Sequence, residues 1–110
     1  MPRTQITSAE LDGNVIRVSG PFDAAPTEVG LILDVVLIQE GAYAHGHTSP
    51  KDSLAADWVV EADTVGAFDP DKPVQSFGSV LLIDLAEPGN AVHQDFAWSQ
   101  VLTLPYPRKA

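Results

Sequence analysis

The strictest constraint on the fold is an alternation of apolar and polar residues near the C-terminal end. Residues 96–104 read FAWSQVLTL, and large side chains there alternate with small or polar ones. Successive side chains of a β-strand point to opposite faces, whereas a helix would spread the same residues around its circumference. The segment therefore predicts a strand with one face in a core. That face would carry Phe96, Trp98, Gln100, Leu102 and Leu104.

Similar segments recur along the chain and are separated by strong turn signals. Asp12-Gly13-Asn14 contains a hairpin dipeptide, and Gly20-Pro21 stops a strand because proline donates no hydrogen bond to a neighbour. Residues 28–41 fit one face of a helix as well as one face of a strand, but their β-branched content and Gly30 favour the strand. Strands are predicted over residues 6–11, 14–20, 28–41, 57–65, 77–87 and 96–104.

These segments predict an all-β fold, an antiparallel β-sandwich of about seven strands. The 110 residues suffice for one domain, so residues 1–110 are expected to form a single sandwich domain with residues 105–110 as a tail. The alternation predicts a core that includes Ile16, Val18, Leu33, Val35, Leu81, Ile83, Trp98 and Leu102.

The opening segment ITSAELDGNVIRVSG (residues 6–20) resembles the first strand pair of bacterial immunoglobulin-like and fibronectin-III-like domains. Trp58 after a long loop, the Phe77-Gly78 strand start and the closing WSQVLTL fit the same plan. The resemblance implies an immunoglobulin-like sandwich, an architecture that carries many unrelated functions. No cysteine pair accompanies the tryptophan, so the resemblance concerns the pattern of strands.

Charge and cysteine content exclude several function classes. Fifteen acidic against six basic side chains give a formal net charge of −9, which repels phosphate backbones and anionic lipid. We therefore expect no binding to nucleic acid or to membranes. The longest apolar run, GLILDVVLI, is interrupted by Asp34 and is too short to span a bilayer. The absence of cysteine excludes a disulfide scaffold, a thiolate metal site and a thiol nucleophile.

The N-terminal residues MPRTQITSAELDG hold no apolar stretch of signal-peptide length. We expect a cytoplasmic location for the chain as given. A mature segment cut from an exported protein is the other interpretation, because bacterial surface modules often lack cysteine as well.

The segment AYAHGHTSPKD (residues 42–52) holds the chain's most suggestive chemistry. In an extended segment His45 and His47 would point to the same side and offer two imidazoles to one metal. Cupins, a family of small β-barrels, also use a His-x-His pair, and the resemblance implies Asp52 and His93 as further ligands of zinc, iron or manganese. Asp57 and Asp95 are alternative third ligands. The glycine and proline nearby instead favour an exposed loop, Ala42–Asp52, that binds no metal tightly. We prefer the loop.

Two functional hypotheses follow. The first is a non-catalytic sandwich module, without cofactor or catalytic residue, that binds a protein partner or forms a homo-oligomer. The second is a small cupin-like metal-binding protein or enzyme that uses His45, His47 and His93. Asp34 and Asp84 lie inside apolar segments and are interpreted as outward-facing charges. Trp98 is predicted to lie in the core. For Trp58 two roles are left open, namely core packing or a stacking platform for a sugar ring.

Overall fold

A computed structural model describes residues 4–22, 27–48, 57–70, 72–87, 89 and 92–107, except for the side chains at positions 93 and 95–97. The described residues form seven β-strands and no helix, so none of them could cross a membrane as a helix. The strands are β1 (Ser8–Asp12), β2 (Val15–Gly20), β3 (Glu28–Gln39), β4 (Ala42–Thr48), β5 (Trp58–Val65), β6 (Val74–Asp84) and β7 (Val92–Leu102). The prediction of an all-β fold with about seven strands is confirmed.

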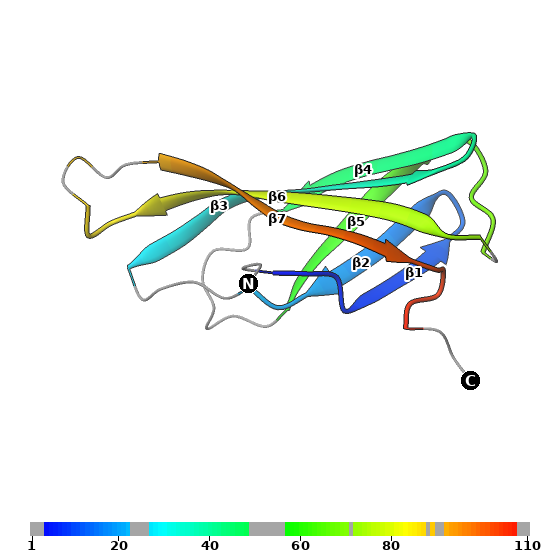
Figure 1. Ribbon diagram of the computed structural model, residues 1–110, viewed down its shortest axis with the longest axis horizontal. Helices are drawn as coiled ribbons and strands as arrows, with labels where there is room; N and C mark the ends of the chain where they lie inside the picture. The colour runs from blue at the N-terminus through cyan, green and yellow to red at the C-terminus, as the bar shows by residue number, and fades with distance from the viewer. Residues whose placement is uncertain are drawn as a thin grey trace.

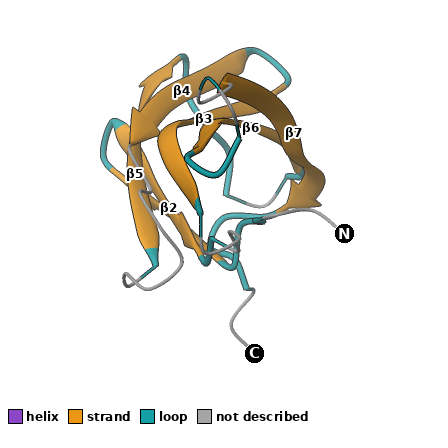
Figure 2. Ribbon diagram, turned by 90° about the vertical axis from the view of Figure 1, so that its left-hand side faces the viewer, coloured by secondary structure: helices purple, strands orange, loops and turns teal. Residues whose placement is uncertain are grey.

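All seven strands belong to one sheet in the order β1-β2-β5-β4-β3-β6-β7, and every neighbouring pair is antiparallel. The sheet curls around its own inner face, as the end-on view shows (Figure 2). The hydrogen bonding therefore joins the strands into one curled sheet and does not divide them into the two sheets that the sequence predicted. β3, β6 and β7 run along the length of the molecule and extend beyond the other strands at one end (Figure 1).

Two contacts link the outermost strands of the curled sheet. The Gln100 side chain of β7 accepts a hydrogen bond from the backbone N–H of Ile6 at 3.2 Å and donates one to its carbonyl at 3.1 Å. Tyr106 exchanges two backbone hydrogen bonds of 2.8 Å with Ala9 of β1. Prolines flank Tyr106, yet its own N–H and carbonyl both pair with Ala9, so at this residue the segment expected as a tail is held against β1.

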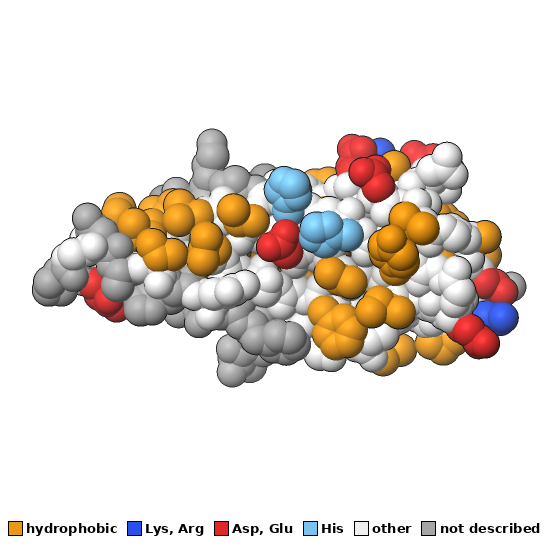
Figure 3. All heavy atoms as spheres, turned by 90° about the horizontal axis from the view of Figure 1, so that it is seen from above, with side chains coloured by type: hydrophobic (Ala, Val, Ile, Leu, Met, Phe, Trp, Pro, Cys, Tyr) orange, Lys and Arg blue, Asp and Glu red, His pale blue; other side chains and the backbone are white. Residues whose placement is uncertain are grey.

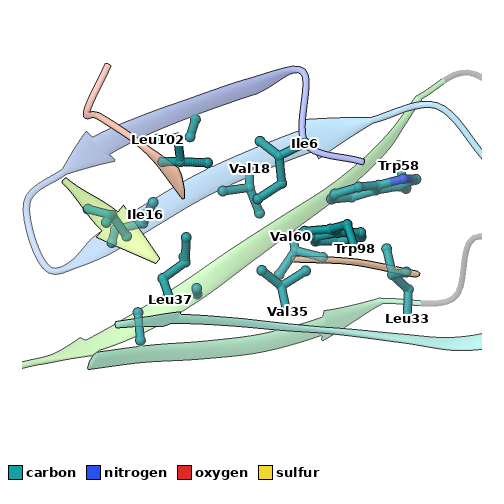
Figure 4. Packing of buried hydrophobic residues seen from close by; sticks show 14 of the residues in the cluster. Ile6, Ile16, Val18, Leu33, Val35, Leu37, Trp58, Val60, Trp98 and Leu102 are labelled. Atoms are coloured by element: carbon teal, nitrogen blue, oxygen red, sulfur yellow. The ribbon is translucent and has the colours of Figure 1, made fainter. Parts of the chain in front are cut away.

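The core lies on the concave inner face. Among the described residues, it contains 20 buried apolar side chains, including Trp58 and Trp98, whose rings stack at 5.5 Å with an angle of 8° between them (Figure 4). Trp58 comes from β5 and Trp98 from β7, so the stack joins the two halves of the curled sheet. Trp98 is a core residue as predicted, and Trp58 is buried beside it rather than exposed as a platform for a ligand.

Six of the eight predicted core residues are buried, namely Ile16, Val18, Leu33, Val35, Trp98 and Leu102. Leu81 and Ile83 were assigned to the wrong face of β6, because Val80 and Leu82 are the buried pair. Asp84 is on the same side of β6 as the buried Leu82, but it lies at the strand end, where its carboxylate accepts a hydrogen bond from Thr27 Oγ1 at 2.8 Å. A charge at a strand end reaches solvent without exposing the rest of its face.

The structure also corrects the prediction that Ala42–Asp52 is a loop. Residues Ala42–Thr48 form β4, which pairs with β3 through a tight turn at Glu40 and Gly41, where Gly41 has a φ of 80°. Positions 49–52, including Asp52, lie outside the described residues. The predicted loop before Phe77 is likewise too long, because β6 begins at Val74. β7 begins four residues before the predicted start at Phe96.

Small inner-face residues on β4 allow the sheet to bend sharply. Ala42, Ala44 and Gly46 are all buried, and β5 pairs with β4 only over three residues before it crosses the inner face. A Cβ at Gly46 would lie 2.6 Å from Val60 Cγ1, far inside normal contact. The inner side of β4 therefore packs by close backbone approach, and its larger side chains all point outward.

Candidate functional site on the outer sheet face

The outer face of β4 carries both histidines of the His-x-His pair. His45 and His47 are two residues apart on the strand, so both side chains point away from the core, and both are exposed. Their ring centroids lie 6.5 Å apart. The exposure predicted for them as loop residues is therefore correct, although a strand holds them.

Asp34 of β3 is a carboxylate in contact with this pair. It lies directly opposite His47 in the β3–β4 register, and its Oδ1 is 3.5 Å from Nε2 of His45. Asp63 of β5 lies opposite His45 on the other side, so carboxylates flank the imidazoles on both neighbouring strands. The side chains of His45 and Asp34 are 56% and 43% exposed, and an ion pair this exposed contributes only about 0–1 kcal/mol. The geometry favours an adaptable surface cluster rather than a rigid structural pair. We call His45, His47 and Asp34 the histidine cluster.

The other predicted metal ligands do not join this cluster in the described part of the chain. The backbone of His93 lies on β7, and β3 and β6 separate that strand from β4. Three strand spacings correspond to roughly 14 Å across the sheet. Asp57 is exposed just before β5, Asp52 lies outside the described residues, and the side chain of Asp95 is not described. Among the described residues, no group of three or more His, Asp or Glu side chains is arranged to hold a metal ion.

Apolar side chains that are exposed or half-buried lie on both sides of the histidine cluster (Figure 3). On one side, in the extended end of β3, β6 and β7, lies a group that we call the arm patch. It consists of Ile32, Leu81, Ile83 and Val92, in which Ile32 pairs with Leu81 and Ile83 with Val92. On the other side, around the β3–β4 turn, lies the hairpin patch. It consists of Val36, Ile38, Tyr43, Val65 and Phe77, joined by the pairs Val36–Phe77, Ile38–Tyr43 and Tyr43–Val65.

The hairpin patch contains an open, largely apolar hollow. Val36, Ile38, Tyr43 and Val65 line it together with the backbone of the β3–β4 turn. A second hollow lies between β1 and residues 104–107, and Glu10 is the only acidic or basic side chain among the residues that line it. Neither hollow gathers the paired acids, bases or nucleophiles that catalysis needs. The apolar hollow is suited to receive a side chain from a bound surface.

The sequence interpretation missed Asp34 as the neighbour of the histidines and missed the two patches. A signal for the strand was present, because residues 42–47 read AYAHGH, in which small residues alternate with Tyr43, His45 and His47. The preceding Glu40-Gly41 marks a tight turn of the kind that joins two strands. Together these features predict a hairpin with β3, and a hairpin of that register brings Asp34 beside His47.

Comparisons of the chain with protein-family models, with curated proteins and with solved structures find no match. The arrangement of its own residues is therefore the basis for any functional inference.

Proposed function

We propose that this chain is a non-catalytic, immunoglobulin-like sandwich module that binds another protein through the outer face of β3, β4 and β6. The observation that carries the proposal is the set of exposed apolar side chains on that face. Ile38 is 44% exposed, Tyr43 53% and Val65 52%, and the strand register makes them direct neighbours. Contiguous apolar side chains on the surface of a folded domain mark interaction sites more often than scattered ones do.

The strand order supports the immunoglobulin-like part of the proposal. When the strands are lettered A to G in chain order, the sheet reads A-B-E-D-C-F-G. Immunoglobulin-like sandwiches have an ABED sheet and a CFG sheet, and the present order places these two sheets side by side. The β3–β4 hairpin joins strands C and D here, and the Trp58–Trp98 stack packs one half against the other. On this interpretation, the curled sheet acts as two layers around one core.

A photo-crosslinking experiment tests the proposed binding face. A photoreactive phenylalanine analogue at Tyr43, in cells that naturally make the chain, should capture a discrete protein species, and the change Ile38→Asp should abolish capture. The matched control is the same analogue at Val59, a β5 residue 49% exposed but outside both patches. Equal capture from Val59, or capture that survives Ile38→Asp, would overturn the proposal.

The cupin-like alternative stays a prediction with its own test. It requires nitrogens of His45, His47 and His93 about 2.0–2.1 Å from one zinc ion. The exposed, same-sided His45 and His47 are the observation in its favour. Protein purified without a histidine tag and dialysed should hold stoichiometric zinc, iron or manganese on this alternative, and lose it in a His47→Ala variant. Metal-free protein that takes up no zinc at equimolar concentration would rule the alternative out.

A further inference from the structure

The outer face has the layout that a two-fold symmetric contact requires. The histidine cluster lies between two apolar patches, and along β3 Ile32 of the arm patch and Val36 of the hairpin patch are each two residues from Asp34. In a two-fold interface the same surface meets itself, so it must be complementary to itself. A face with one polar centre and an apolar patch at each end satisfies this condition.

The centre of the face is also complementary to itself in hydrogen bonding, and in charge when the imidazole is protonated. Asp34 only accepts hydrogen bonds in its ionised form, whereas an imidazole always carries at least one N–H donor. If a two-fold axis lies in the plane between two faces and passes between Asp34 and His45, each aspartate faces the imidazole of the other copy. This axis is perpendicular to the line from Asp34 to His45 and crosses the strands obliquely, because the two residues are diagonal neighbours on β3 and β4. It places the arm patch of one copy over the hairpin patch of the other.

We infer that the partner of this face is a second copy of the chain, bound face to face in a two-fold dimer. This inference rests on the proposed function and names its partner. Sheets packed in this way lie about 10 Å apart, a distance at which apolar side chains from the two faces interdigitate. The hollow beside Ile38 and Tyr43 receives side chains from the arm patch of the other copy.

The net charge of each copy opposes their association. Each copy carries a formal charge of −9, so copies repel each other at long range. Glu61 and Asp63 on β5 add negative charge at the margin of the face. Salt screens such exposed charges and leaves apolar contacts intact. Dimerisation of this kind therefore strengthens as ionic strength rises, opposite to the behaviour of a contact held by ion pairs.

Sedimentation of the purified chain tests the inference. Over about a hundredfold range of concentration, its average mass should rise from one chain toward two, because association follows mass action. Val65→Asp in the hairpin patch and Val92→Asp in the arm patch should each weaken the dimer roughly tenfold or more, since each buries an unpaired charge. Val59→Asp, equally exposed on the same strand as Val65 but outside the patches, should leave the dimer unchanged. Circular dichroism should show that all three variants fold.

The arrangement of the two copies has a separate readout. A nitroxide attached to a Val92→Cys variant, mixed with isotope-labelled chain, should broaden the amide signals of Tyr43 and Val65 in the labelled copy; the natural chain has no cysteine to interfere. Broadening at residues 81–83 instead, a chain that stays monomeric, or a dimer unaffected by Val65→Asp would each overturn the inference. A monomeric chain whose Tyr43 position still captures a different protein would leave the proposed binding face standing and remove only the dimer.

Discussion

At the scale of single residues, the two stacked tryptophans differ in the surroundings of one atom. Both are buried, with 5% of Trp58 and 4% of Trp98 exposed. Trp58 Nε1–H is shared between Thr4 Oγ1 at 2.7 Å and the Pro21 carbonyl at 3.1 Å. Trp98 Nε1 is buried and has no hydrogen-bond partner among the described residues. Comparing the two residues therefore distinguishes the contribution of indole packing to stability from the contribution of the indole hydrogen bond.

We expect Trp58→Phe to lower the free energy of unfolding more than Trp98→Phe, by about 1–2 kcal/mol. The first change removes a buried hydrogen-bond donor that Thr4 Oγ1 and the Pro21 carbonyl share, whereas the second removes a donor that has no partner among the described residues. Urea denaturation followed by circular dichroism measures both variants. Equal costs, or a larger cost for Trp98→Phe, would contradict the prediction. Trp98→Ala is expected to cost about 3–5 kcal/mol, because it leaves a cavity under Gly78 and Trp58.

At the scale of elements, one buried amide fixes the loop between β5 and β6. Gln39 ends β3 and is buried, and its Nε2 donates to the carbonyls of Asp69 at 2.9 Å and Lys72 at 3.2 Å. Its Oε1 accepts from the Asp69 backbone N–H at 2.7 Å. The sequence shows Gln39 only as a polar residue at the end of an apolar segment, so its role depends on the loop that folds over it.

Gln39→Leu should destabilise the fold by about 1–3 kcal/mol, since it removes the side-chain donor to the Asp69 and Lys72 carbonyls and the acceptor for the Asp69 N–H. Amide hydrogen exchange should show faster exchange at Asp69, while the strand amides of β3 stay protected. Gln75→Leu is the matched control, because its side chain is only partly buried on the outer side of β6. If exchange at Asp69 were unchanged in Gln39→Leu, the amide would have no role in holding the loop.

At the scale of the whole molecule, the charge predicts which macromolecules the chain avoids. Fifteen acids against six bases give a formal net charge of −9, which repels a phosphate backbone and leaves few cations to displace its counterions. We expect no mobility shift of a duplex DNA fragment at micromolar protein and physiological salt. A shift that persists under those conditions, and weakens as salt increases, would refute this expectation.

The sequence by itself determined the elements whose signals are local. Alternation within FAWSQVLTL predicts a strand with Trp98 and Leu102 in the core, and Gly13 at a turn predicts the first hairpin. Both signals depend on a few consecutive residues, because strand pleating and turn conformation are set by the local backbone. The all-β class follows from the same kind of pattern, whereas the net charge of −9 follows from composition. The exposure of His45 and His47 is expected from a loop, although a strand provides it.

Only the tertiary structure decided which residues meet across strands. The buried face of β6 is the one with Val80 and Leu82, because it continues the side on which Gly78 packs under the Trp98 ring. His47 faces Asp34, and His93 lies three strands away, because register and strand order fix such distances between residues far apart in the chain. The same strand pairing aligns the arm patch, the histidine cluster and the hairpin patch on one face. Local alternation gives each strand two faces, but only the closing of the sheet selects the face that points toward the core.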